Sequence, residues 1–191
     1  NAAFSILFKD QDKADRFMTV IEDFAAKTPY TMQQAAMNAR RLLAYGFDAS
    51  SIEPVMATLA DASAASGDAE TFLRVGRALG QIQTKGKLAA QELLQLTEAG
   101  IPAFDILKDK LKLTRDQLAE IGRQKIPADV AINAILHGMQ ERYGGAAEVM
   151  SNTVEGMLGT IKDNALIIGN EAFEPMYESF KSTLTKLREA S

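Results

Sequence analysis

Helix-ending residues recur at short intervals along this chain, and their spacing limits what it can fold into. Good helix formers, above all Ala, Leu, Met, Gln, Glu and Lys, dominate its 191 residues. The apolar–polar alternation typical of strands is nearly absent. Breaks fall roughly every 10 to 20 residues, at Thr28-Pro29, Gly46, Ser66-Gly67, Gly86, Gly100-Ile101-Pro102, Thr114, Pro127 and Gly144-Gly145. Because no helix can run straight through them, we predict an all-α protein of short helices.

The same breaks divide the chain into two parts. We predict a compact multi-helix bundle over residues 1–145, which ends at Gly144-Gly145. Residues 146–191 have a helical pattern again, and we predict a long, extended C-terminal helical segment there. The bends of that segment are expected at Gly156, Gly159, Gly169 and Pro175. The chain begins with Asn1 and has no initiator methionine, so we expect it to be a piece of a longer protein.

Short polar signals predict where individual helices begin. Thr31 with Gln34, and Thr114 with Gln117, have the spacing of capping boxes, in which each side chain accepts a hydrogen bond from a free backbone N–H. The expected helices begin at about residues 10, 31, 48, 68 and 88, and a further one has Pro127 at its first position.

The composition excludes several kinds of chemistry. Cysteine is absent, which excludes disulfides, thiol catalysis and cysteine-ligated metal centres. The only histidine, His137, has no second His with which to form a metal site, and we expect a structural residue beside core positions. The segment GQIQTKGK, from Gly80 to Lys87, resembles a phosphate loop but has the wrong glycine spacing and no hydroxyl after the lysine. We therefore predict no catalytic, cofactor-binding or metal-binding residue, and no cofactor.

Charge and hydropathy argue against two classes of partner. The formal net charge is −4, which does not favour a protein that binds nucleic acid over its whole surface, and no sequence-specific nucleic acid is expected. No stretch approaches the ~20 apolar residues of a membrane-spanning helix. We expect a soluble fragment without a membrane partner.

The charges are nevertheless grouped in blocks. Residues 24–47 contain three basic residues and no acid, residues 48–70 five acids and no base, and residues 71–91 four basic residues and no acid. Neighbouring antiparallel helices could pair these charges. Alternatively, the last block could form a basic stripe that docks an acidic partner, or more remotely nucleic acid. We name Arg74, Arg77, Lys85 and Lys87 as this basic stripe, and we expect charge reversal at Lys85 and Lys87 to weaken partner capture without unfolding the protein.

Small and flexible apolar residues complete the predicted core. Gly76 and Gly80 are four residues apart on one helical face, which predicts the close approach of another helix. Methionines are expected at core positions throughout, namely Met32, Met37, Met56, Met139, Met150, Met157 and Met176.

Three stretches carry a resemblance to a known family. They are LLAYGFD from Leu42 to Asp48, ALGQIQTKGKLAAQELLQLTEAGIPAF from Ala78 to Phe104, and YGGAAEVMSNTVEGMLGTIKDN from Tyr143 to Asn164. In this order and at these separations, they resemble the N-terminal domain of tail tape measure proteins of bacteriophages and prophages. The similarity runs from about residue 15 to about residue 165.

The resemblance implies a structural role in the virion. Tape measure proteins are long, largely helical proteins in the lumen of the tail tube, where they template tube assembly, set tail length and take part in DNA ejection. It implies tail tube subunits, tail assembly chaperones and other copies of the chain as partners. The implied locations are the virion and, during assembly, the bacterial host cytoplasm. The family motifs look structural, so no active-site residue is implied.

Two other functions are kept as alternatives. A helical envelope-interacting or pore-forming domain could open an amphipathic face, including Phe72, Val75 and Leu79, onto lipid. A muramidase-like hydrolase would need a carboxylic acid with a raised pKa in an apolar cleft and a second carboxylate nearby, for which Glu92 and Glu98 are conceivable.

Overall fold

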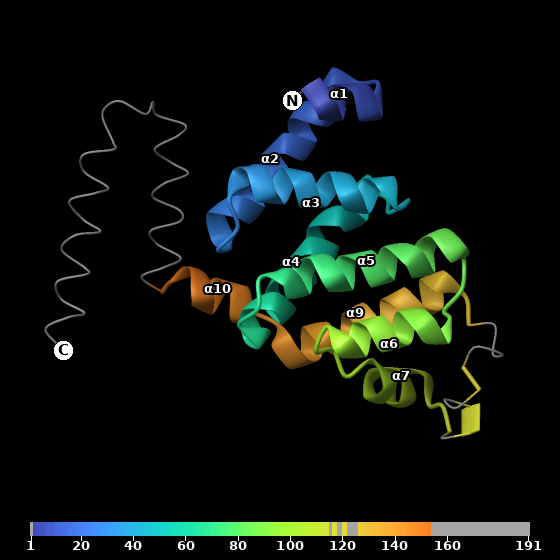
Figure 1. Ribbon diagram of the computed structural model, residues 1–191. Helices are drawn as coiled ribbons and strands as arrows, with labels where there is room; N and C mark the ends of the chain where they lie inside the picture. The colour runs from blue at the N-terminus through green and yellow to red at the C-terminus, as the bar shows by residue number, and fades with distance from the viewer. Residues whose placement is uncertain (1, 115, 118–119, 122–125, 154–191) are drawn as a thin grey trace, which may run out of the picture.

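The computed structural model describes residues 2–114, 116–117, 120–121 and 126–153 of the chain. Its helices, labelled in Figure 1, are α1 (Ala2–Phe8), α2 (Gln11–Lys27), α3 (Met32–Ala44), α4 (Ala49–Ser66), α5 (Glu70–Lys85), α6 (Ala90–Glu98), α7 (Ala103–Leu111), α9 (Ala128–Tyr143) and α10 (Ala146–Ser151). Within the described ranges no strand forms, and a single isolated bridge joins Lys87 to Pro127. The prediction of an all-α fold is confirmed.

Helix α4 lies at the centre of the bundle and contacts α2, α3, α5, α9 and α10 (Figure 1). Its residues from Val55 to Ser63 are buried on nearly every side, with Ala57 alone half-buried. A helix that is apolar around most of its circumference needs neighbours on most sides, which explains its central place. Helices α2, α3, α5, α6 and α7 are amphipathic and turn one face toward their neighbours.

Local signals account for most helix ends. The Thr31–Gln34 capping box forms, with both reciprocal hydrogen bonds present, and Thr114 with Gln117 makes the second one. Gly67 ends α4 and Gly86 ends α5 with φ values of 68° and 70°, a left-handed conformation that favours glycine. Helix boundaries in this part of the chain are therefore decided by the residues at the ends themselves.

Two details of the predicted boundaries are wrong. Pro127 is the N-cap of α9 and not its first residue, because the backbone around it is extended and held by residues 86–88. Two backbone hydrogen bonds join these segments: Leu88 N–H donates to Ile126 O at 2.9 Å, and Ala128 N–H donates to Gly86 O at 3.1 Å. Helix α1 was not predicted from the sequence. It is held by ring packing of Phe4 and Phe8 against Phe17.

Glycines allow two pairs of helices to approach closely. A Cβ added to Gly80 on α5 would lie 2.3 Å from ring atoms of Tyr45, the residue that caps α3, whereas one added to Gly76 would make only an ordinary contact at 3.5 Å. The close approach predicted for these two glycines is therefore confirmed at Gly80 alone. A Cβ on Gly138 of α9 would lie 2.4 Å from Cγ2 of Ile106 on α7. Only glycine leaves space for these two neighbours.

The methionine prediction is only partly right. Met56 and Met139 are buried and Met32 packs partly against the core. Met37 and Met150 are instead exposed, at 42% and 37% of their surface. Met157 and Met176 lie outside the described residues.

Packing continues past the glycine pair at residues 144–145. Helix α10 contacts α4 and α2, and the backbone N–H of Ala147 donates to buried Asp61 at 3.0 Å. The carboxylate is thereby hydrogen-bonded at the N-terminal end of a helix, where negative charge is stabilised. The compact unit thus includes residues up to Ser151. The extended segment predicted beyond it lies mostly outside the described residues and stays a prediction.

Candidate partner-binding surface

The predicted basic stripe follows α5 and the turn after it. All four of its residues are exposed, but their charges are not equally available. The guanidinium of Arg74 pairs with Asp68, which also accepts a hydrogen bond from the backbone N–H of Glu70 at the start of α5. Arg77 makes no ion pair with any described residue. Lys87 is exposed, while its neighbours Gly86 and Leu88 are tied to residues 126–128.

Lys85 has a structural role that the sequence did not reveal. Its Nζ lies 2.5 Å from Oε1 of Glu92, whose side chain is 0% exposed. Oε2 of Glu92 is also buried and has no hydrogen-bond partner in the described structure. Removing water from a carboxylate is expensive unless an opposite charge compensates it. Lys85 is therefore part of the α5–α6 packing, and from the structure we expect reversal of its charge to destabilise the protein.

Pairing between charge blocks explains little of the surface. Arg74 with Asp68 is the one ion pair that joins two of the three blocks within the described ranges. The other pairs between different helices are Lys85 with Glu92 and Lys110 with Glu141. The basic residues of the first block, which is free of acids, have no such partner on the described helices.

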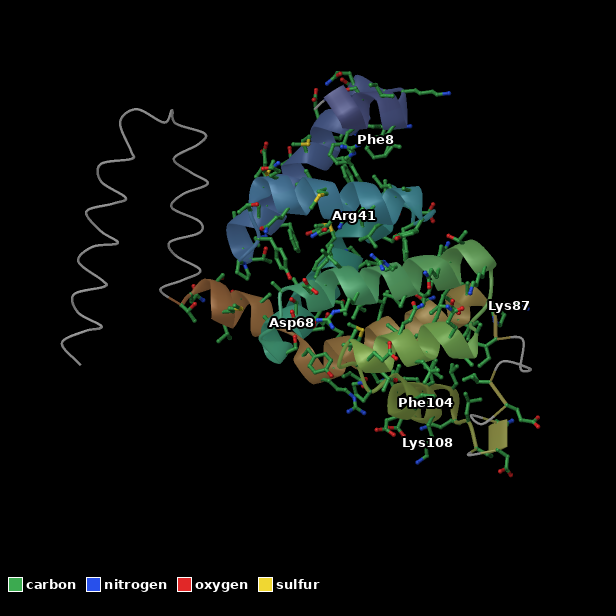
Figure 2. All side chains as sticks on the ribbon, in the orientation of Figure 1. Phe8, Arg41, Asp68, Lys87, Phe104 and Lys108 are labelled. Atoms are coloured by element: carbon green, nitrogen blue, oxygen red, sulfur yellow. The ribbon has the colours of Figure 1, made fainter. Side chains whose placement is uncertain are left out.

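A concave basic and apolar surface lies on α1, α3 and α5, around Arg41. Arg41 is labelled in Figure 2. A hollow of about 600 Å³ is bordered by Ile6, Leu7, Met37, Arg40, Arg41 and Ala44. A second hollow of about 290 Å³ lies between α3 and α5 and includes Asn38, Arg41, Leu73 and Arg77. Because Arg41 borders both hollows, they are neighbours, and we call them together the Arg41 face.

The Arg41 face was only partly predicted. Of the four residues of the basic stripe, it includes Arg77 alone. Arg40 and Arg41 belong to the basic block of residues 24–47, but the sequence pattern alone does not assign them to a surface. The sequence does indicate a basic surface in that block, because residues 24–47 hold three basic residues and no acid.

A larger groove of about 1080 Å³ lies between α4 and α9. Apolar side chains such as Val55 and Leu136 line it, together with charges of both signs, among them Asp129 and Lys110. Mixed charges give this groove no preference for an acidic or a basic partner. It is therefore less informative about a partner than the Arg41 face.

The candidates for chemistry do not converge on one site. Glu92 is buried against Lys85, whereas Glu98 is exposed. His137, expected beside core positions, is instead exposed, with its Nδ1 3.5 Å from Oε1 of Glu141. The pocket predicted for a hydrolase, with two carboxylates in an apolar cleft, is not formed by Glu92 and Glu98.

The groups with displaced pKa values also lie apart. A hydrogen bond from Lys110 lowers the pKa of Glu141 on α9. Burial raises the pKa of Tyr30, in the turn between α2 and α3, and a hydrogen bond with Ser63 partly opposes this. Active sites tend to bring such groups together. No group of three or more His, Asp or Glu suited to a metal ion occurs in the described part of the chain.

The faces proposed to open onto lipid are in the core. Phe72 is 2% exposed, and Val75 and Leu79 are fully buried. Within the described ranges, every helix is too short or too polar to cross a bilayer. The amphipathic pattern of α5 therefore serves packing against α4 and α6.

Comparison with known protein families gives one match. Residues 1–188 match the family model described as tape measure protein. Neither a curated protein nor a solved structure matches the chain significantly.

Proposed function

The chain belongs to the tape measure protein family, structural proteins of phage tails, and we propose that it serves as the folded docking module of such a protein. In this proposal the parent protein sets tail length, templates the tail tube and takes part in DNA ejection. The module anchors the tape at the start of assembly, and the measuring length lies outside it. Its partners are tail tube subunits, tail assembly chaperones and other copies of the chain. No enzymatic activity is part of the proposal.

The location follows from the same role. The module would be in the host cytoplasm during assembly and in the lumen of the tail tube in the finished virion. Its surface supports contacts with proteins, because the Arg41 face exposes apolar and basic side chains together.

The observation that carries the proposal is that the described helices fold back on one another. Thr58 on α4 hydrogen-bonds Gln140 on α9 across 82 residues of sequence, at 3.0 Å. Asp61 on α4 reaches Ala147 across 86 residues. A measuring rod gains about 1.5 Å per residue only if it stays extended. Because this part of the chain is compact, its length in residues cannot translate into tail length.

A tandem duplication tests this separation of docking from measuring. A second copy of residues 2–153 would be inserted directly after the first in the gene of the parent phage. If this part is a folded module, tail length in electron micrographs should stay within the wild-type distribution. If it is part of the ruler, the 152 added residues of helix should lengthen the tail by about 230 Å.

The matched control is an insertion of equal length taken from the helical region of the parent protein outside this module. That insertion should lengthen the tail in proportion. Tails lengthened equally by both insertions would contradict the proposal.

A further inference from the structure

The Arg41 face combines two properties that seldom occur together on a surface with no partner. Its apolar side chains are unusually open to solvent, with Ile6 at 78%, Leu7 at 49% and Met37 at 42% exposure. Across the second hollow, Leu73 is 38% exposed. Contiguous exposed apolar side chains next to arginine are typical of protein interfaces, whose cores are enriched in Met and Arg.

The charge of the face has one sign. Arg40, Arg41 and Arg77 border its hollows, and no acidic residue borders either of them within the described ranges. None of the three arginines makes an ion pair with a described residue. The face is thus positive on a protein whose net charge is −4. A positive patch without internal partners is complementary to an acidic one.

A buried amide supplies a second, independent sign of an absent partner. Asn38 borders the smaller hollow, is 4% exposed, and its Oδ1 is buried without a hydrogen-bond partner. A buried carbonyl oxygen without a donor costs about 1–3 kcal/mol. A ligand with both donors and acceptors would satisfy the amide and the two neighbouring guanidinium groups together.

From these observations, we propose that the Arg41 face binds an acidic segment of another protein that also carries large apolar side chains. A carboxylate of the partner sits between Arg41 and Arg77, and a backbone N–H of the same segment donates a hydrogen bond to Oδ1 of Asn38. Its apolar side chains fill the larger hollow against Ile6, Leu7 and Met37. The inference rests on the proposed function, since it specifies the chemistry of an assembly partner.

Nucleic acid and lipid fit the face less well. Binding to a nucleic acid backbone relies on a row of cationic contacts to phosphates. Here two arginines, Arg40 and Arg41, border a mainly apolar hollow, and Arg77 borders the smaller one. A lipid surface would not require the narrow hollow between Arg41 and Arg77 or the Asn38 amide within it. An acidic protein segment with apolar side chains can pair with the arginines, fill the apolar hollow and hydrogen-bond to the Asn38 amide.

Site-specific photo-cross-linking tests the proposal in the intact parent protein. Met37 or Leu73 would be replaced by p-benzoylphenylalanine in cells that are assembling tails, and the attached peptide identified by mass spectrometry. We expect a peptide of a different protein, rich in Asp or Glu and in large apolar residues. Arg41→Glu with Arg77→Glu should lower its yield at least about tenfold, and Arg41→Gln with Arg77→Gln should lower it less.

The control variant is Lys108→Glu with Arg142→Glu. It makes the same change of charge on exposed residues of α7 and α9 that border neither hollow, and should leave the yield unchanged. Figure 2 shows Lys108 well away from Arg41. Thermal unfolding of each variant, followed by circular dichroism, shows that it is folded. Cross-links to nucleic acid, lipid, a basic peptide or the chain itself would overturn the proposal. So would no cross-link at all, or equal yields from both glutamate variants.

Failure of the cross-linking proposal can be told apart from failure of the proposed function, which the tandem duplication tests. Tail length after the tandem duplication does not depend on what binds the Arg41 face. An acidic cross-linked peptide together with lengthened tails would leave the face intact and remove the docking role. Unchanged tail length together with a cross-link to another kind of molecule would support the docking role and overturn the proposed acidic partner.

Discussion

Replacing Lys85 with methionine is expected to lower the free energy of unfolding by about 3 kcal/mol. The substitution keeps most of the aliphatic side chain and removes the cation that, among the described residues, contacts Glu92, whose carboxylate is fully buried. Breaking a buried ion pair from one side costs about 3–5 kcal/mol, and the lower end applies because Lys85 is 43% exposed. Urea unfolding of the purified chain, followed by circular dichroism, measures the change.

The double variant separates the ion pair from general packing. Lys85→Met combined with Glu92→Leu removes both charges and should recover most of the lost stability, because no uncompensated carboxylate remains. Lys87→Met is the matched control two residues away and should change stability by less than about 0.5 kcal/mol. A Lys85→Met variant as stable as the Lys87→Met variant would show that Glu92 does not depend on this partner.

Gly138→Ala should destabilise the protein by about 2 kcal/mol, although alanine is ordinarily the better residue in a helix. In an open position the change would gain about 1 kcal/mol. Here the new methyl group would lie 2.4 Å from Cγ2 and 3.2 Å from Cβ of Ile106. Ile106 is 1% exposed, so its side chain is enclosed and cannot turn out into solvent. Overpacking of this kind typically costs about 1–3 kcal/mol and separates the two helices.

Gly76→Ala provides the comparison within the same fold. Its added methyl group would meet Cδ1 of Leu59 at 3.5 Å, an ordinary contact, so stability should be unchanged or slightly higher. Combining Gly138→Ala with Ile106→Ala should cost less than the sum of the two single changes, because the second removes the clashing atoms. Equal stability of the Gly138→Ala and Gly76→Ala variants would contradict the packing of α7 on α9.

The sequence was most informative where structure is decided locally. The capping box at Thr31 and the left-handed glycines after α4 and α5 depend on a few adjacent residues, and all formed as expected. The C-terminal helix α10 was less predictable, since its place depends on Asp61, 86 residues earlier. Helix α1 has no cap signal of its own and depends on contacts of Phe4 and Phe8 with α2.

The surface was predicted less well because it depends on which charges are already paired. Lys85 was assigned to a free stripe although its partner, Glu92, was visible in the apolar periodicity. Leu88, Glu92 and Leu96 are spaced four residues apart, and all three are buried. A carboxylate at a buried position of this apolar pattern needs a cation to compensate its charge. The Arg41 face could not be assembled from the sequence because its residues come from α1, α3 and α5.

Membership of the tape measure protein family and the folded helices lead to one account. We propose that this part of the chain acts as a compact body with a surface for a partner, and that the length of the tail is measured elsewhere. The stability predictions test the packing of that body, while the cross-linking experiment tests what it binds. Its compactness is the premise on which both rest.

Small-angle X-ray scattering of the 191-residue chain tests that premise most directly. A compact unit of 152 residues has a radius of gyration of about 15 Å, and 38 further residues in one helix would add about 57 Å to its length. We therefore expect a maximum dimension of no more than about 110 Å. A value near the 290 Å of a single continuous helix would contradict the account.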